Sequence, residues 1–204
     1  MGKLIDFIFQ RVFMAMLASG IFLVLALCGG LVLGIAPAGS VLMTLFAQYR
    51  YNYKQYKWTE AWTLFKENFV RSNQIFYTFF VTESAFLYGI YLIIQVPQSI
   101  LTVLVTIFNL VFAVIIPLGY AVYLKLQVYF DMSYFNSLKL SFIGMFLSLL
   151  SMFKILIGAA IVLMILYLAP ALVFFVFIGA WHFFISDLLE PVYQVVSSSI
   201  VAEP

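Results

Sequence analysis

The sequence predicts an all-α polytopic membrane protein with about six spans arranged as three helical hairpins. Hydrophobic residues make up 66% of the 204 residues and charged residues only 9%, whereas a soluble domain has about 45–50% and about 25%. The few charges gather in short clusters that separate three apolar blocks, residues 12–49, 72–124 and 140–186. So few charges cannot cover a soluble surface, which excludes a soluble enzyme, a disordered chain and a disulfide-stapled secreted module.

Each apolar block is long enough for two crossings, because a helix crosses the bilayer with about 20 residues. Each block also has a proline near its middle, Pro37, Pro97 or Pro170, and proline breaks or redirects a helix. We therefore expect a single transmembrane domain over residues 1–187, followed by a short cytoplasmic tail over 188–204. The expected spans are 12–34, 36–50, 73–95, 99–123, 142–167 and 170–187.

The basic residues indicate the orientation, because Lys and Arg mark the cytoplasmic side of a membrane protein. In the three-hairpin layout they all lie on, or could face, the side opposite the proline tips, so we expect both termini in the cytoplasm. Segment 36–50 is short for a span. It either crosses, with Arg50 reaching up to the headgroups, or re-enters on the same side, which would place the N-terminus outside.

Two segments between the first and second blocks have interfacial character. Residues 49–58 interleave Tyr and Trp with Lys and Arg, as expected at a cytoplasmic membrane surface, so we expect no nucleic-acid partner. Residues 59–72 predict an amphipathic cytoplasmic helix. Such a helix lies on the membrane, docks within the chain or binds a partner protein.

Small residues recur at helical spacing in two places and predict close helix packing. The first set could instead form a dimer face, and the second could line a polar pathway. Residues 65–69 also resemble residues 138–142 at an offset of 73, which is either a weak internal repeat or chance. The two sets are Ala26, Gly30 and Gly34, and Ser137, Ser141, Gly144, Ser148 and Ser151.

Glu83 is the most informative single residue, because it falls near the centre of an expected span. An ionised carboxylate there costs about 2.5–3.5 kcal/mol. One hypothesis pairs it with Lys154 at similar depth, with Asn109 as a third member. In the alternative, Lys154 snorkels to the cytoplasmic edge and Glu83 is a neutral acid bonded to neighbouring polar groups.

Two stretches resemble the YesL family, small bacterial membrane proteins grouped as a domain of unknown function. One is Gly30-Leu-Val-Leu-Gly-Ile-Ala-Pro-Ala38, and the other runs from Trp62 to Asn73. Gly39 departs from the family, which often has Thr after the Pro-Ala. The resemblance implies a context, since members commonly accompany carbohydrate importers of the ATP-binding-cassette (ABC) type and two-component sensors in Gram-positive bacteria. The signature residues are Gly34, Pro37, Ala38, Phe65, Lys66 and Phe69.

We find no enzyme constellation, and one cysteine and one histidine make no metal or haem motif. We therefore expect no cofactor. Three functions remain for a multi-pass protein of the bacterial cell membrane. It could be an accessory component that contacts an importer permease or a sensor kinase, a small solute transporter or channel that uses Glu83, or a scaffold without transport activity. The sequence does not specify the oligomeric state.

Overall fold

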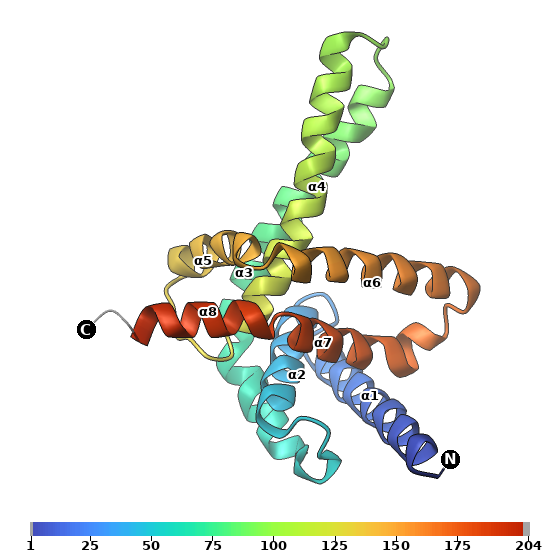
Figure 1. Cartoon of the computed structure of the whole chain (residues 1–204), viewed down its shortest axis with the longest axis vertical. Helices are drawn as coiled ribbons and strands as arrows, with labels where there is room; N and C mark the ends of the chain where they lie inside the picture. The colour runs from blue at the N-terminus through green and yellow to red at the C-terminus, as the bar shows by residue number, and fades with distance from the viewer. Residues whose placement is uncertain (1, 202–204) are drawn as a thin grey trace.

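The computed structural model describes the chain from residue 2 to residue 201, with side chains described over residues 7–199 except 173. This part of the chain is helical and contains no strand (Figure 1). The α-helices are α1 (Gly2–Cys28), α2 (Ile35–Tyr49), α3 (Trp58–Ile94), α4 (Ile100–Leu126), α5 (Tyr134–Leu147), α6 (Leu149–Leu168), α7 (Ile178–Leu188) and α8 (Glu190–Val201). A short 3-10 turn, η1 (Tyr53–Gln55), precedes α3, and a π-helical turn, η2 (Val173–Phe177), precedes α7.

Four helices in the described range are long and apolar enough to cross a membrane: α3, α4, α6 and the Phe7–Cys28 part of α1. A fifth span arises if Phe174–Leu188 and Glu190–Ser199, which meet at a 45° bend, are counted as one. The chain is thus a helical protein with four to five candidate spans. Six spans in three hairpins are not shown, because α2 has only 15 residues, or about 22 Å at 1.5 Å per residue.

The first helix ends earlier than the expected boundary at residue 34. After Cys28 the chain forms a tight turn, in which Gly30 has φ +73° and Leu31 has φ +61°. Helical residues have negative φ, so the turn stops α1. Consequently Ala26, Gly30 and Gly34 do not share one helix face.

The expected surface helix over 59–72 and the expected span over 73–95 form one uninterrupted helix, the 37-residue α3. No glycine or proline stands near residue 72 to separate them. The loop after α3 holds Pro97, at the predicted tip, and Ser99 then starts α4 with a capping box to Thr102.

The expected span over 142–167 is broken at Ser148, which has φ −149° and ψ 80°. The stripe of small residues therefore divides between α5 and α6. The expected tail also differs: from Glu190 it forms α8, and Val192 and Val196 of this helix are buried in a core cluster with Leu189.

The helices form a packed body from which one hairpin projects (Figure 1). One core cluster joins α1, α2 and α7 around Leu25, Phe46 and Phe183, and a second joins α4, α5 and α8. The far halves of α3 and α4, residues 80–115, extend away from this body (Figure 1). We call this segment the α3–α4 arm.

Candidate functional site

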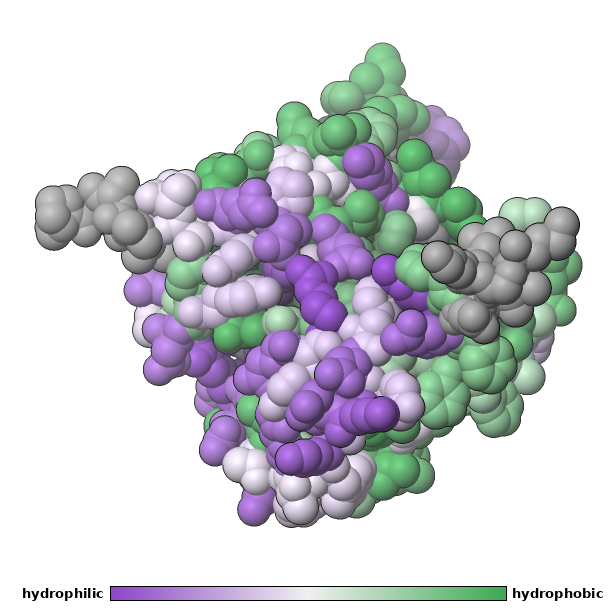
Figure 2. All heavy atoms as spheres, turned by 60° about the horizontal axis from the view of Figure 1, so that its bottom comes forward, coloured by the Kyte–Doolittle hydropathy of each residue, from purple (hydrophilic) through white to green (hydrophobic). Residues whose placement is uncertain are grey.

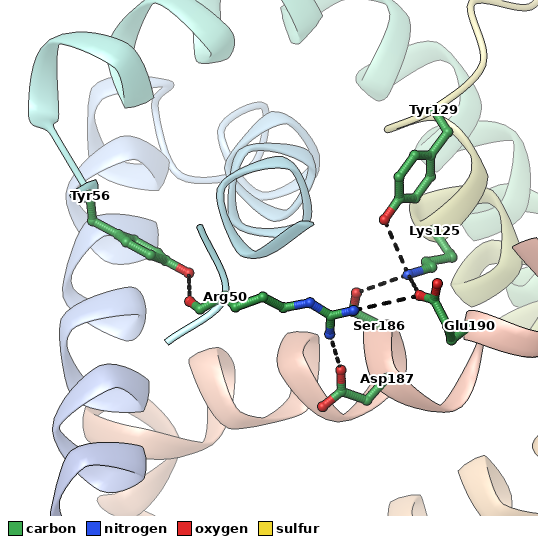
Figure 3. A network of polar contacts seen from close by, with 7 residues as sticks. All are labelled: Arg50, Tyr56, Lys125, Tyr129, Ser186, Asp187 and Glu190. Atoms are coloured by element: carbon green, nitrogen blue, oxygen red, sulfur yellow. Dashed lines mark hydrogen bonds and ion pairs between the residues drawn. The ribbon is translucent and has the colours of Figure 1, made fainter. Parts of the chain in front are cut away.

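Hydrophilic side chains gather on one face of the molecule, the one that Figure 2 turns towards the reader. At this face the ends of α2 and α4 meet the joint between α7 and α8. Six polar residues connect them, and Figure 3 shows their contacts. We call this group the charged cluster: Arg50, Lys125, Tyr129, Ser186, Asp187 and Glu190.

Lys125, near the end of α4, is the centre of the charged cluster, and its side chain is only 1% exposed. Its Nζ atom lies 2.8 Å from Glu190 Oε2, 3.3 Å from Ser186 Oγ and 3.5 Å from the Tyr129 hydroxyl. Burial raises the pKa of Tyr129 above its usual value, so this hydroxyl stays neutral. A buried cation is tolerated only when it is paired and hydrogen-bonded, and this ammonium is both.

Arg50 extends the cluster to α2. Its guanidinium donates to Asp187 and lies 3.8 Å from Glu190 Oε2. Its backbone has φ +48°, an uncommon value for a residue other than glycine, and its carbonyl accepts a 2.9 Å hydrogen bond from the Tyr56 hydroxyl. These contacts hold the end of α2 against the α7–α8 joint.

A second ionic contact joins α3 to the loop after α4. The guanidinium of Arg71 donates to the carboxylate of Asp131 and to the carbonyl oxygen of Met132. Asp131 is almost fully exposed, so this ion pair contributes little by itself. The charged cluster is therefore the stronger of the two ionic connections.

The sequence predicts that the charges of both contacts lie at the membrane boundary, but it does not predict how they pair. The partners are far apart in the chain: Asp187 follows Arg50 at a separation of 137 positions, and Glu190 follows Lys125 at a separation of 65. The only pattern in the sequence that points to these contacts is that charged residues of both signs lie at the ends of the apolar blocks. Nothing in their spacing indicates which helix ends meet.

The two family-signature stretches lie against each other. Asn73 of α3 donates a 2.9 Å hydrogen bond to the Leu33 carbonyl, and Tyr77 donates a 2.8 Å bond to the Val32 carbonyl. Both bonds hold the turn over residues 29–34. One helical turn from Asn73, the Phe69 carbonyl accepts a second bond from the same amide at 2.8 Å.

The other signature residues lie around the same turn. A Cβ atom on Gly34 would lie only 2.7 Å from the Ala26 Cα atom, so Gly34 permits the close approach of α1. Pro37 and Ala38 are buried in α2, and Phe65 is 3% exposed beside Gly29. Phe69 is half-buried, whereas Lys66 is exposed.

A polar chain joins three helix segments beside this turn. The hydroxyls of Ser40 and Ser72 lie 2.7 Å apart, and the Gln127 amide donates to Ser40 Oγ at 2.8 Å. Ser40 and Ser72 are buried, and buried polar groups need such partners. These contacts connect α2, α3 and the end of α4.

The structure does not bring Glu83 and Lys154 together. No ion pair joins them among the described side chains, and Lys154 lies on α6 facing α7. Asn109 is buried, but its amide donates to the Val105 carbonyl of its own helix at 2.8 Å. It packs against Gly89 of α3, so the proposed three-residue group is not formed.

The small-residue stripe lies partly in contacts between helices. Ser137, Ser141 and Ser151 are buried, and a Cβ atom on Gly144 would lie 2.7 Å from Val122 of α4. Ser148 stands at the break and its hydroxyl lies 2.8 Å from that of Ser151.

Four helices of spanning length and apolar composition, with ion pairs at the ends of α2, α4 and α7, define a multi-pass helical membrane protein. Residues 15–90 match the family model described as "Protein of unknown function, DUF624", which corresponds to the YesL-type membrane proteins. The resemblance seen in the two signature stretches is thereby confirmed, and the matched region contains the 29–34 turn with the α3 residues that bind it. No curated protein and no solved structure matches the chain.

Proposed function

We propose that the protein is an accessory membrane subunit, without enzymatic activity of its own, of a carbohydrate ABC importer or its two-component sensor. The family resemblance supplies this context. In the proposed arrangement the charged cluster faces the cytoplasm of a Gram-positive bacterium and both termini are cytoplasmic, as the positive-inside rule favours. Short helices such as α2 would complete the six-span layout.

The observation that carries the proposal is the α3–α4 arm. In the most apolar windows of α3 and α4 only 6% of the residues are buried, against 39% in α1. Phe80, Leu87 and Tyr91 on α3 and Leu104 and Phe108 on α4 are exposed. The arm therefore offers two long membrane-level faces that the rest of the chain leaves uncovered.

Glu83 is an acidic residue on the α3 side of the α3–α4 arm. Its Oε2 atom is buried, yet it has no hydrogen-bond partner in the described part of the chain. An intramembrane carboxyl without a partner is costly. The Glu83 side chain as a whole is only half-buried, so a basic side chain on the membrane helix of another protein would approach its other oxygen and offset this cost, which favours an arm that docks against a partner.

Photo-crosslinking in the native membrane tests the proposal. A benzophenone amino acid at Leu87, 51% exposed on the arm, should cross-link a permease subunit or a sensor kinase. The matched control is Val24, 45% exposed on α1, which should give lipid adducts only. Cross-linking from Val24 but not from Leu87 would refute docking through the arm.

A pair of substitutions assigns the role of Glu83. Glu83→Gln should reduce the partner recovered in mild detergent several-fold, because it removes the carboxylate. Ser84→Ala is the control, since the Ser84 hydroxyl donates only to the Phe80 carbonyl of its own helix at 2.8 Å. Solute flux in liposomes that Glu83→Gln abolishes would instead indicate a transporter, and neither partner nor flux would indicate a scaffold.

A further inference from the structure

An apolar groove runs between α6 and α7. Its volume is about 460 Å³, and nearly all of its surface is hydrocarbon or aromatic. Gly158 allows the two helices to meet, because a Cβ atom there would lie 2.5 Å from the ring of Phe184. The main lining residues are Ile157, Ile161 and Ile165 on one side and Phe177, Trp181 and Phe184 on the other.

Lys154 is the charged residue of this groove and stands at one end of it, where Leu188 also lines the wall. That end is next to the charged cluster, since Asp187 precedes Leu188. Asp187 is paired with Arg50, and Glu190 is shared by Arg50 and Lys125. Across the described side chains Lys154 has no ion pair, so its ammonium leaves a positive charge at the groove's polar end.

The length of the groove fits one lipid chain. From Lys154 to Ile165 the helix rises about 16 Å at 1.5 Å per residue. The hydrocarbon core of a bilayer is about 30 Å thick, so one leaflet contributes about 15 Å. The distance from the ammonium to the far end of the groove thus equals the depth of one leaflet.

We propose that this groove is a binding site for an anionic phospholipid of the surrounding bilayer. The lipid phosphate contacts the Lys154 ammonium, and one acyl chain lies between α6 and α7. Basic residues beside grooves between membrane helices select anionic headgroups. A zwitterionic lipid brings its own ammonium, so it gains less from Lys154. The site is independent of the α3–α4 arm.

Native mass spectrometry of the full chain tests the charge preference. With dioleoyl phosphatidylglycerol and dioleoyl phosphatidylcholine in equal amounts, the wild type should retain phosphatidylglycerol several-fold better. Lys154→Met should abolish that preference. Lys139→Met removes an exposed cation from α5 and should preserve it. Equal retention of the two lipids by the wild type, or an equal loss in both variants, would overturn the proposal.

A second pair of variants tests the groove itself. Val162 lines the groove, whereas its neighbour Leu163 is 67% exposed and does not. Val162→Phe should displace the bound lipid, and Leu163→Phe should not. Equal retention by both variants would contradict a lipid held in the groove.

Labelling of the wild-type protein gives a test that does not depend on the folding of any variant. Phosphatidylglycerol with a diazirine on its acyl chain should label peptides that contain residues 157–165 or 177–184. Uniform labelling of all spans would show annular lipid only and would refute the site.

Discussion

At the scale of single residues, the burial of Lys125 is the feature that most needs an explanation. A lysine ammonium has three donors, and here Glu190, Ser186 and Tyr129 lie within reach of it. The stacked rings of Tyr129 and Tyr193, with centroids 3.9 Å apart, lie 5.2 and 5.7 Å from the Lys125 ammonium. The charge is therefore stabilised locally, and it connects α4 to α7 and α8.

Lys125→Met should destabilise the fold by about 3 kcal/mol, because it leaves Glu190 without its closest cation. Thermal unfolding in mild detergent, followed by tryptophan fluorescence, would measure the loss as a lower midpoint. Lys139→Met, on the exposed side of α5, should unfold like the wild type. In the double variant with Glu190→Gln the losses should be less than additive, and strict additivity would show that the two residues do not interact.

At the scale of elements, the turn between α1 and α2 depends on two of its glycines and also on contacts from α3. Gly30 supplies the left-handed conformation, Gly34 permits the approach to Ala26, and Asn73 binds the Leu33 carbonyl. Some carbonyl groups of the turn have no helical hydrogen bonds, because α1 has ended. Hydrogen bonds donated by side chains of α3 satisfy them instead.

Gly34→Ala should destabilise this turn by about 1–3 kcal/mol, since the added methyl overlaps the Ala26 backbone and forces a shift. Gly20 is the matched control, because nothing lies within 4 Å of a Cβ atom placed there. Gly20→Ala should be neutral or slightly stabilising, as alanine favours a helix interior by about 1 kcal/mol. Equal unfolding midpoints for the two variants would contradict the close approach.

Asn73→Leu should cost about 1–3 kcal/mol, because it leaves the Leu33 carbonyl without its donor. Asn68 makes the same kind of bond to its own helix, to the Leu64 carbonyl at 2.9 Å, and among the described side chains it makes no bond to the turn. Asn68→Leu should therefore cost much less. Hydrogen exchange at residues 29–35 should increase in Asn73→Leu alone, and unchanged exchange there would refute the contact.

The sequence predicted well where a local breaker decides the structure, and less well where distant contacts decide it. Pro97 and Pro170 lie in the connections that follow α3 and α6, whereas Pro37, the third expected tip, lies in the first turn of α2 just after the connection. The early end of α1 was missed because a glycine pair inside an apolar run also occurs within membrane helices. The pairing of Lys125 with Glu190 depends on how helix ends pack, so no local pattern reveals it.

At the scale of the whole molecule, the arrangement separates a charged face from apolar surfaces. Figure 2 shows a face on which hydrophilic residues gather, and the tip of the α3–α4 arm projects from the body in Figure 1. In the proposed topology, which the positive-inside rule favours, the charged face lies in the cytoplasm and the arm tip lies outside the cell.

Labelling of single cysteines in intact cells tests this topology most directly. In a Cys28→Ser background, Gln98→Cys at the exposed arm tip and Lys54→Cys in exposed η1 would be treated with a membrane-impermeant maleimide. We expect Gln98→Cys to react in intact cells and Lys54→Cys to react only after permeabilisation. Reaction of Lys54→Cys in intact cells, with protection of Gln98→Cys, would contradict the topology and the cytoplasmic charged cluster.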